Sequence, residues 1–327
     1  MLPWFKDQFP LYLAPMAGVT DVTFRELTKE LGADVTVTEF VSAEGIMQRD
    51  DRTRKYTEFT EAQRPVGVQI FGADGERMGE AAKKIIDWKQ PDFIDINFGC
   101  PVKKVVSKNG GSSLLKDCPV LASVARGIHK AVGDQVPVTA KIRVGWDEQN
   151  INALEVTRLL EEEGIQAIAI HGRTRSQGYT GQANWDIINE CAEDRTIPII
   201  GNGDINTVQD VARRKNETKV AGIMIGRTAM EHPWIFKEVK TYLETGEIPE
   251  PISLKKRWEF IVRHCSMALE SNRYGDELQT MRHMRGRLMS YCKGFPHSKQ
   301  LRQVLCKVET LRAVKDIAHK FIEPAEV

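Results

Sequence analysis

Residues 138–170 read VTAKIRVGWDEQNINALEVTRLLEEEGIQAIAI, and their pattern indicates the fold class. Two short apolar runs, 138–142 and 167–170, flank an amphipathic stretch at 152–163 that stops at Gly164. Runs that are apolar at nearly every position are typical of strands buried on both faces of a parallel sheet. Glycine directly after an amphipathic stretch is typical of a helix end. The stretch therefore predicts one strand–helix–strand unit.

The same alternation repeats along residues 1–245. Apolar runs lie at 11–14, 35–38, 66–70, 93–96, 138–142, 167–170, 197–200 and 221–225, and helical patterns such as 21–31 and 119–132 lie between them. Eight strands alternating with helices over ~240 residues predict an α/β fold, a (β/α)8 TIM barrel. An open, doubly wound sheet is the alternative, but it usually shows a glycine fingerprint in the first strand–helix turn, which this sequence lacks.

Composition excludes several classes of protein. The 327 residues are 41% hydrophobic and 28% charged, which is typical of a globular protein and not of a disordered one. We find no run near the ~18 apolar residues that span a bilayer and no secretory signal pattern at the N-terminus. The six cysteines have no paired spacing of the kind found in disulfide scaffolds or metal sites. We therefore expect a cytoplasmic protein with no membrane partner.

The net charge of +1 conceals an uneven distribution. Residues 251–327 carry 15 Lys and Arg against 8 Asp and Glu, whereas residues 1–250 carry 31 against 37. Pro249 and Pro251 mark a linker at 246–253, and helical patterns follow at 254–269, 276–293 and 298–319. We expect a small all-α domain over 254–327, and its basic surplus suggests a polyanionic partner. A bundle that is merely well solvated would show the same surplus.

Polar or glycine-rich residues follow or end all eight runs, where the active site of a barrel lies. They are Pro15-Met16-Ala17-Gly18, Glu39, Gln69, Asn97, Lys141 with Arg143, His171 to Arg175, Gly201-Asn202-Gly203-Asp204, and Gly226-Arg227. A single buried polar group is often only a satisfied core residue, but eight at one end of a barrel indicate a site.

The last two of these groups predict a phosphate site. Glycine N–H groups and a helix N-terminus after the seventh and eighth strands commonly bind phosphate in such barrels, and Arg227 adds a planar cation. Lys141 has three open roles: a Schiff-base nucleophile, an electrostatic partner of a cofactor, or the partner of a carboxylate. His171 lacks neighbours at metal-ligand spacing, so we expect no metal.

Cys100 is the most distinctive candidate for chemistry. It lies in Asn97-Phe98-Gly99-Cys100-Pro101, just beyond a strand end, on a loop that Gly99 and Pro101 shape. A thiol with an ordinary pKa near ~8.5 is mostly protonated at neutral pH and is able to donate a proton. Cys118, Cys191 and Cys265 suit the role of small buried apolar residues.

Together these motifs resemble the tRNA-dihydrouridine synthases, and most of all the bacterial B-type members. The resemblance rests on residues 13–21, 95–101, 141–143, 171–175 and 201–205, in the family's order, and it covers nearly the whole chain. It implies an FMN-binding TIM barrel over 1–245, a linker at 246–253 and a helical tRNA-binding domain over 254–327.

The resemblance also implies roles for individual residues. FMN would be held by Pro15, Met16, Ala17, Gln69, Lys141, His171, Asn202, Gly203, Asp204, Gly226 and Arg227. The uracil would face Asn97, Arg173 and Arg175, and tRNA would contact Arg282, Arg285, Arg287 and Lys293. Hydride from NADPH or NADH would pass through FMN to C6 of a tRNA uridine that has been extruded into the site, while Cys100 protonates C5.

Two other functions stay open at this point. A flavin oxidoreductase acting on a small substrate would share the barrel but would have no need of a basic helical tail. A tRNA-binding protein with an inactive barrel would purify without flavin absorbance. The sequence does not set the oligomeric state.

Overall fold

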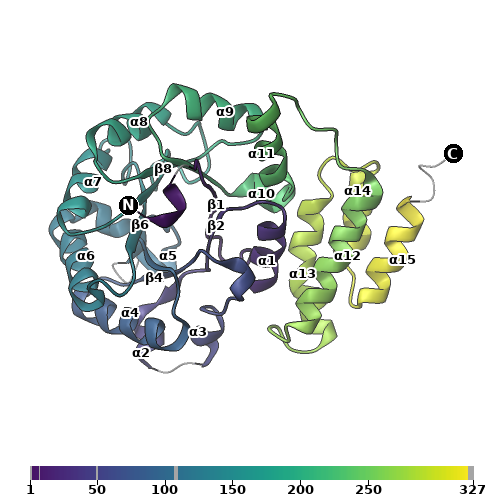
Figure 1. The fold of residues 1–327 in the computed structure, drawn as a ribbon. Helices are drawn as coiled ribbons and strands as arrows, with labels where there is room; N and C mark the ends of the chain where they lie inside the picture. The colour runs from purple at the N-terminus through teal and green to yellow at the C-terminus, as the bar shows by residue number, and fades with distance from the viewer. Residues whose placement is uncertain (1, 7, 49–50, 107–109, 323–327) are drawn as a thin grey trace.

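The computed structural model describes residues 2–6, 8–48, 51–106 and 110–322. Its central element is a parallel sheet that closes on itself (Figure 1). The strands of this sheet are β1 (Leu11–Leu13), β2 (Val35–Val37), β3 (Val41–Ser42), β4 (Val66–Phe71), β5 (Phe93–Asn97), β6 (Val138–Arg143), β7 (Ile168–His171), β8 (Ile199–Asn202) and β9 (Gly222–Ile225). Strand β1 pairs with β2 and β9, and β2 also pairs with β4, which completes the ring. The prediction of a (β/α)8 barrel is confirmed, and the doubly wound alternative is wrong.

The short strand β3 was not among the eight predicted runs. It has two residues and pairs in parallel with the carboxyl end of β4, Val41 opposite Ile70. Because β2 and β4 already pair directly, β3 extends the rim of the barrel and is not an additional strand of its wall.

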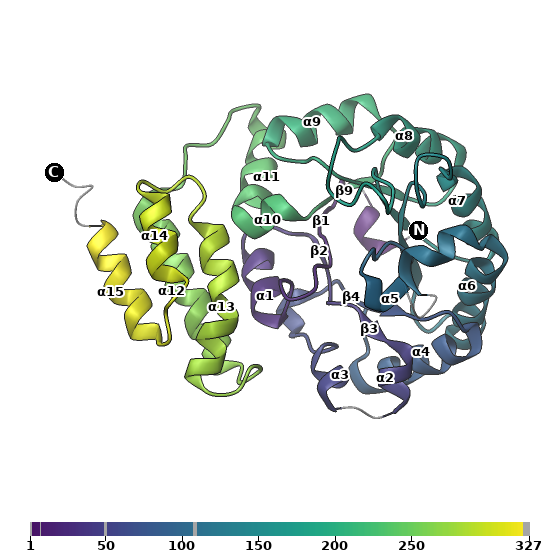
Figure 2. The same cartoon turned by 180° about the vertical axis from the view of Figure 1, so that it is seen from behind.

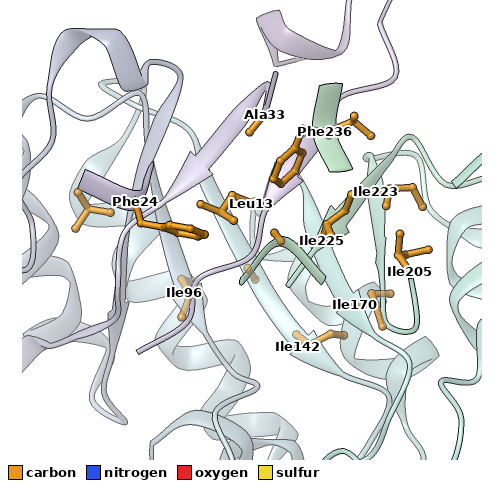
Figure 3. Packing of buried hydrophobic residues seen from close by; sticks show 14 of the residues in the cluster. Leu13, Phe24, Ala33, Ile96, Ile142, Ile170, Ile205, Ile223, Ile225 and Phe236 are labelled. Atoms are coloured by element: carbon orange, nitrogen blue, oxygen red, sulfur yellow. The ribbon is translucent and has the colours of Figure 1, made fainter. Parts of the chain in front are cut away.

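Alternate residues of each strand face opposite sides of the barrel wall. Outward residues such as Ile142, Ile170 and Ile223 pack against the surrounding helices, together with Phe24 of α1 (Val22–Glu30) and Phe236 of α11 (Ile235–Thr245) (Figure 3). Because successive side chains of a strand point to opposite faces, the residues between these outward ones point into the barrel. The apolar runs therefore bury both faces of every strand, as their composition predicts.

The amino end of the barrel is sealed by apolar side chains. The short helix η1 (Pro3–Phe5) places Phe5 in one cluster with inward residues such as Tyr12, Phe93 and Met224. Trp4 donates its indole N–H to the Tyr12 hydroxyl at 2.6 Å. Because this end is filled, the open mouth of the barrel is at the carboxyl ends of the strands.

Helices surround the barrel wall (Figures 1 and 2). Besides α1 and α11 they are α2 (Ala43–Met47), α3 (Asp51–Lys55), η2 (Glu61–Gln63), α4 (Gly75–Lys89), α5 (Lys103–Val106), η3 (Gly111–Lys116), α6 (Cys118–Val132), α7 (Ala153–Glu162), α8 (Trp185–Asp194), α9 (Val208–Glu217) and α10 (Arg227–Glu231). Many begin at a side-chain cap, for example Thr207, whose hydroxyl accepts the Asp210 N–H in a capping box at the start of α9. The predicted helices at 21–31, 119–132 and 152–163 are all present to within a residue or two.

Four helices follow the barrel and lie to one side of it (Figure 1). They are α12 (Leu254–Glu270), α13 (Glu277–Tyr291), α14 (Ser298–Leu305) and α15 (Leu311–Ile322). Residues 246–253 form neither helix nor strand. The predicted helix at 298–319 is two helices, because the chain turns at 306–310. The expected domain ended at residue 327, and its last five residues lie outside the described part of the chain.

The contact between these helices and the barrel is apolar and continuous. Helix α12 packs on α1, and α13 packs on α10. Buried Trp258 and Leu288 of the C-terminal helices belong to the same apolar cluster as Leu27 and Phe236 of the barrel. The helices therefore form part of the protein's main core.

Candidate functional site

A cavity of about 500 Å³ opens at the carboxyl ends of the strands. Its lining includes twelve of the predicted site residues: Pro15, Met16, Ala17, Asn97, Cys100, Lys141, His171, Asn202, Gly203, Asp204, Gly226 and Arg227. Of the predicted catalytic, FMN and uracil residues, the remaining three do not line it: Gln69, Arg173 and Arg175. The parallel register brings the strand ends to one rim, so residues more than 200 positions apart in the sequence meet there.

Lys141 reaches the cavity floor from β6. Its ammonium donates to the Asn202 side-chain oxygen at 3.2 Å, and the Asn202 amide donates to the Met224 carbonyl at 2.7 Å. Lys141 forms no direct ion pair with any described residue, but the charge of Asp95 favours its protonated form, so a carboxylate acts on Lys141 without contacting it. Burial, together with the charge of Arg143, lowers the pKa of Lys141 to about 8. A cation held by a neutral amide keeps its capacity to attract an anionic or carbonyl group of a ligand.

His171 is a neutral side chain in this site. Burial is the largest cause that lowers its pKa far below the ordinary value, and the charges of Lys141 and Arg143 act in the same direction. No group of three His, Cys, Asp or Glu side chains suited to a metal ion occurs in the described ranges. His171 therefore offers ring nitrogens as hydrogen-bond groups for a ligand.

Gly203 and Asp204 form a sharp turn after β8. Both have positive φ, +124° and +51° respectively. The Asp204 carboxylate accepts from Arg173 at 2.8 Å and from the Ala183 N–H at 2.7 Å, and Arg227 lies 3.3 Å away. Burial by itself would raise the pKa of Asp204, but these bonds lower it below its ordinary value. Asp204 thus anchors the two arginines at the cavity edge.

Arg173 is a buried support of this turn. Its guanidinium also donates to the carbonyls of Thr180 and Gly181, at 3.0 and 2.7 Å. Arg173 does not line the cavity, but its Nη1 is buried without a partner among the described residues, so its contact with the uracil stays a prediction. Arg175 instead lies over the Trp146 ring at 4.6 Å, and Lys116 makes a similar contact with this ring at 4.5 Å.

Arg143 lines the cavity together with Arg227, and no role of its own was predicted for Arg143 from the sequence. It donates to the Gly99 carbonyl and to the Thr174 carbonyl, both at 2.9 Å. It therefore ties the Cys100 loop to the loop after β7. The sequence could have predicted this position, because Arg143 follows Lys141 by two residues on one strand and such residues share a face.

The Cys100 loop is fixed by Asn97. The Asn97 side-chain oxygen accepts the N–H groups of Gly99 and Cys100, at 3.1 and 2.8 Å. The Ser112 hydroxyl donates to the Cys100 carbonyl at 2.8 Å. Burial raises the pKa of the Cys100 thiol above its ordinary value. At neutral pH the group at this position is a thiol that carries its proton.

Below the cavity floor, a chain of hydrogen bonds sets the orientation of Asn97. The Gln69 amide donates to the Asp95 carboxylate at 2.6 Å, and the Asn97 amide donates to the Gln69 oxygen at 2.7 Å. Burial raises the pKa of Asp95, whereas the hydrogen bonds from Thr139 and Gln69 favour its ionised form. An ionised carboxylate only accepts, so Gln69 then turns its NH2 group toward Asp95. Its oxygen then faces Asn97, whose own oxygen is left for the Cys100 loop. Gln69 is thus a support of the site, and Asp95, which the sequence analysis missed, begins the chain.

The four predicted tRNA contacts lie on or near α13 and differ in exposure. Arg282 is exposed and pairs with Glu309 at 3.0 Å, and exposed Lys293 pairs with Glu231 at 2.5 Å. Arg285 donates to the Val308 carbonyl at 3.0 Å. Arg287 is buried against the barrel, where it donates to Asp21 and to the Gly18 carbonyl. Arg287 therefore has no surface to offer a polyanion, and its predicted role is corrected to an interface contact.

Comparisons with known proteins show the family. The family model described as dihydrouridine synthase (Dus) matches residues 12–325. A probable tRNA-dihydrouridine synthase of Aquifex aeolicus is 36% identical over 301 residues, covering 92% of each chain. The tRNA-dihydrouridine synthase B of Pseudomonas syringae pv. tomato is 37% identical over 303 residues, covering 93% of this chain and 88% of the relative.

Solved structures share the fold alone. Histamine dehydrogenase from Rhizobium sp. 4-9 has a TM-score of 0.52 at 14% identity, covering 79% of this chain and 48% of that one. In the described residues, no helix is both long and apolar enough to cross a membrane.

The family match spans nearly the whole chain and includes the Cys100 loop and the cavity lining, so this protein belongs to the dihydrouridine synthase family.

Proposed function

We propose that this protein reduces the C5–C6 double bond of uridines in tRNA, using FMN and NADPH or NADH, with Cys100 as the proton donor. The observation that carries the proposal is the position of Cys100 in the lining of the cavity, on a loop that Asn97 and Arg143 hold in place. The names of the relatives, which are tRNA-dihydrouridine synthases, support the choice of tRNA.

The cavity has the chemistry that an FMN site needs. Its volume lies within the ~300–1,000 Å³ typical of cofactor and ligand sites. Pro15, Met16 and Ala17 give an apolar wall suited to a flat ring system, and Lys141 and Asn202 give polar groups beside it. When bound, FMN supplies the hydride chemistry, while the protein supplies binding, orientation and protons.

The phosphate of FMN is assigned to the corner formed by Gly203, Gly226 and Arg227. Helix α10 begins at Arg227, after Gly226, which offers no side-chain cap, so the first N–H groups of the helix are left for another acceptor. Arg227 is exposed at this corner and adds the positive charge that a phosphate requires. Asp204 carries negative charge and is bound to Arg173, so we assign it to positioning Arg227 and not to contacting the phosphate.

Proton delivery is assigned to Cys100. Its raised pKa keeps the proton on sulfur at neutral pH, so the thiol is ready to donate without a preceding ionisation step. Asn97 fixes the backbone of the loop, and Arg143 fixes its neighbouring carbonyl. A positioned donor of this kind contributes roughly 10²- to 10⁴-fold to a rate.

The tRNA is assigned to the basic C-terminal helices and the mouth of the barrel. We keep the division into a catalytic barrel at 1–245, a linker at 246–253 and a tRNA-binding domain at 254–327. Arg282, Arg285 and Lys293 are the proposed phosphate contacts. Each pairs at the surface with a single carboxylate or with carbonyls, and replacing such pairs by phosphate contacts costs little free energy. A uridine has to leave the RNA stack to enter the cavity. A tRNA substrate fits a cytoplasmic location.

The test compares the wild type with Cys100→Ala and Cys100→Ser. Purified protein is examined for flavin absorbance, NADPH and NADH oxidation are followed separately, and dihydrouridine in tRNA is measured by mass spectrometry. We expect Cys100→Ala to bind FMN and oxidise the nicotinamide normally while dihydrouridine formation falls at least 100-fold. Full turnover on tRNA by Cys100→Ala would remove Cys100 from the mechanism, and a wild-type protein that binds no flavin would overturn the proposal itself.

A further inference from the structure

The loop between β1 and α1 forms one wall of the cavity, and the C-terminal helices hold it. Residues 14–17 and Val19 of this loop line the cavity. Between them lies Gly18, whose N–H donates to the Glu39 carboxylate and whose carbonyl accepts from Arg287 at 2.9 Å. A Cβ atom built at Gly18 would meet nothing within 4 Å, so packing does not fix this point of the loop. Within the loop, the Val19 and Thr20 N–H groups donate to the Met16 carbonyl, and the two polar partners tie Gly18 to the rest of the protein.

The first partner, Glu39, is itself held from the C-terminal helices. Arg273, in the turn between α12 and α13, pairs with Glu39 at 2.5 Å, and the two side chains are only 8% and 3% exposed. Arg273 also donates to the Lys55 carbonyl at 2.7 Å. A carboxylate this deeply buried requires a charged partner, because desolvation of an unpaired ion is costly. Without Arg273, Glu39 would favour its protonated form or move toward water.

The second contact runs through Asp21, which follows the loop and caps α1. Its carboxylate accepts the Phe24 N–H at 2.9 Å, the Tyr274 hydroxyl at 2.6 Å and Arg287 at 3.1 Å. Burial by itself would raise the pKa of Asp21, but Arg287 is the largest of several causes that lower it, so the group stays ionised. The loop is therefore tied at Gly18 and at Asp21 by side chains from α13 and the turn before it.

We propose that Arg273, Tyr274 and Arg287 are positioning residues that hold the 14–20 wall of the cavity in its ligand-binding form. The C-terminal helices then have two tasks, because the segment that offers basic residues to RNA also completes the cavity. The identity of the ligand as FMN rests on the proposed function, whereas the order of the loop does not. Loops tied on both sides in this way are preorganised for binding, which lowers the entropy that the ligand has to overcome.

The main variant for the test is Arg273→Met, and the control is Arg263→Met. Arg263 also joins the C-terminal helices to α1, through an ion pair with Glu30, but that pair is exposed, and Glu30 is at the opposite end of α1 from Asp21. Arg273→Lys keeps the charge and provides the conservative comparison. Glu39→Gln keeps an acceptor for Gly18 and removes only the buried charge, and it serves if Arg273→Met does not fold.

Two measurements separate the loop from the whole protein. Hydrogen–deuterium exchange of the apo-protein follows the amides of residues 14–20, and FMN titration by fluorescence quenching gives the dissociation constant. We expect Arg273→Met to speed exchange in 14–20 at least tenfold and to raise the FMN dissociation constant at least tenfold, with smaller changes in Arg273→Lys and Glu39→Gln. Arg263→Met should change neither quantity.

Each outcome decides between the alternatives. Unchanged exchange in 14–20 in a folded Arg273→Met or Glu39→Gln protein would overturn the inference, and so would faster exchange spread evenly over the chain, which indicates general destabilisation. If the wild type binds no FMN while the exchange result holds, the loop assignment stands and the proposed function fails.

Discussion

Gly203→Ala is the substitution whose cost follows most directly from the geometry of the site. Gly203 has φ +124°, which L side chains rarely adopt, and such backbone strain costs ~1–3 kcal/mol. An added Cβ would lie 2.7 Å from the Ala183 Cβ and 3.1 Å from the His171 ring, whereas carbon atoms normally meet at ~3.5–4.0 Å. Overpacking of this kind costs a further ~1–3 kcal/mol. We therefore expect a total loss of about 4 kcal/mol in the free energy of unfolding.

Gly246→Ala is the matched control. Gly246 also has positive φ, +76°, at the end of α11, but a Cβ there meets nothing within 4 Å. Only the left-handed backbone is penalised, by ~1–2 kcal/mol. Both variants gain the same ~0.4–1 kcal/mol from a stiffer unfolded chain, so this effect cancels in the comparison.

The assay is equilibrium unfolding in urea, followed by FMN titration at a temperature at which both variants are folded. Gly203→Ala should unfold at clearly lower urea than Gly246→Ala and should weaken FMN binding at least tenfold, because His171 and Asp204 have to move. Equal stability losses in the two variants would refute the steric argument. Normal FMN affinity in Gly203→Ala would refute the assignment of Gly203 to the binding site.

Three further predictions concern the buried polar groups of the site. Asp95→Leu leaves the Gln69 amide without its acceptor and should lower the free energy of unfolding by about 2–3 kcal/mol in urea titrations. Asp95→Asn keeps an acceptor and should cost about half as much. Equal costs would contradict the hydrogen-bond chain from Asp95 through Gln69 to Asn97. His171 has a depressed pKa in the folded protein, so its contribution to stability is present above the unfolded pKa of ~6.5 and is lost as pH falls below it. His171→Gln should therefore reduce the slope of stability against pH between pH 6.5 and 4.5 by up to ~1.4 kcal/mol per unit, and an unchanged slope would show that His171 is not the group responsible. The rate at which iodoacetamide alkylates Cys100, measured by mass spectrometry of its peptide, should rise with a pH midpoint above the ordinary thiol value of ~8.5. A midpoint below ~8.5 would show an activated thiolate and a different role.

Much of the site was predictable because the barrel is periodic. Alternation along a strand sends Lys141 and Arg143 to one face, and parallel closure brings the ends of distant strands to one rim. Cys100 could be placed at that rim from its position just past a strand end. These arguments require only local pattern and the geometry that all such barrels share.

The partners of each polar side chain were not predictable in the same way. The sequence shows Arg173, Arg282 and Arg287 as similar cations, but the fold pairs Arg173 with Asp204, leaves Arg282 at the surface and buries Arg287 against Asp21. Which arginine meets a ligand depends on which carboxylate packs beside it, and such pairs are separated by up to 266 positions.

The sequence by itself determined the barrel, the helical segment after it, the position of Cys100 and the uneven charge, because period, strand-end position and charge count are local quantities. Tertiary structure decided that Gln69 supports the site from below and that Asp95 orients Asn97. It also decided that the C-terminal helices, which the sequence presents as a binding domain for tRNA, contact a wall of the cavity. The physical reason is that a buried charge or amide has to find a partner in three dimensions, and only the packed chain fixes which partner lies within hydrogen-bond distance.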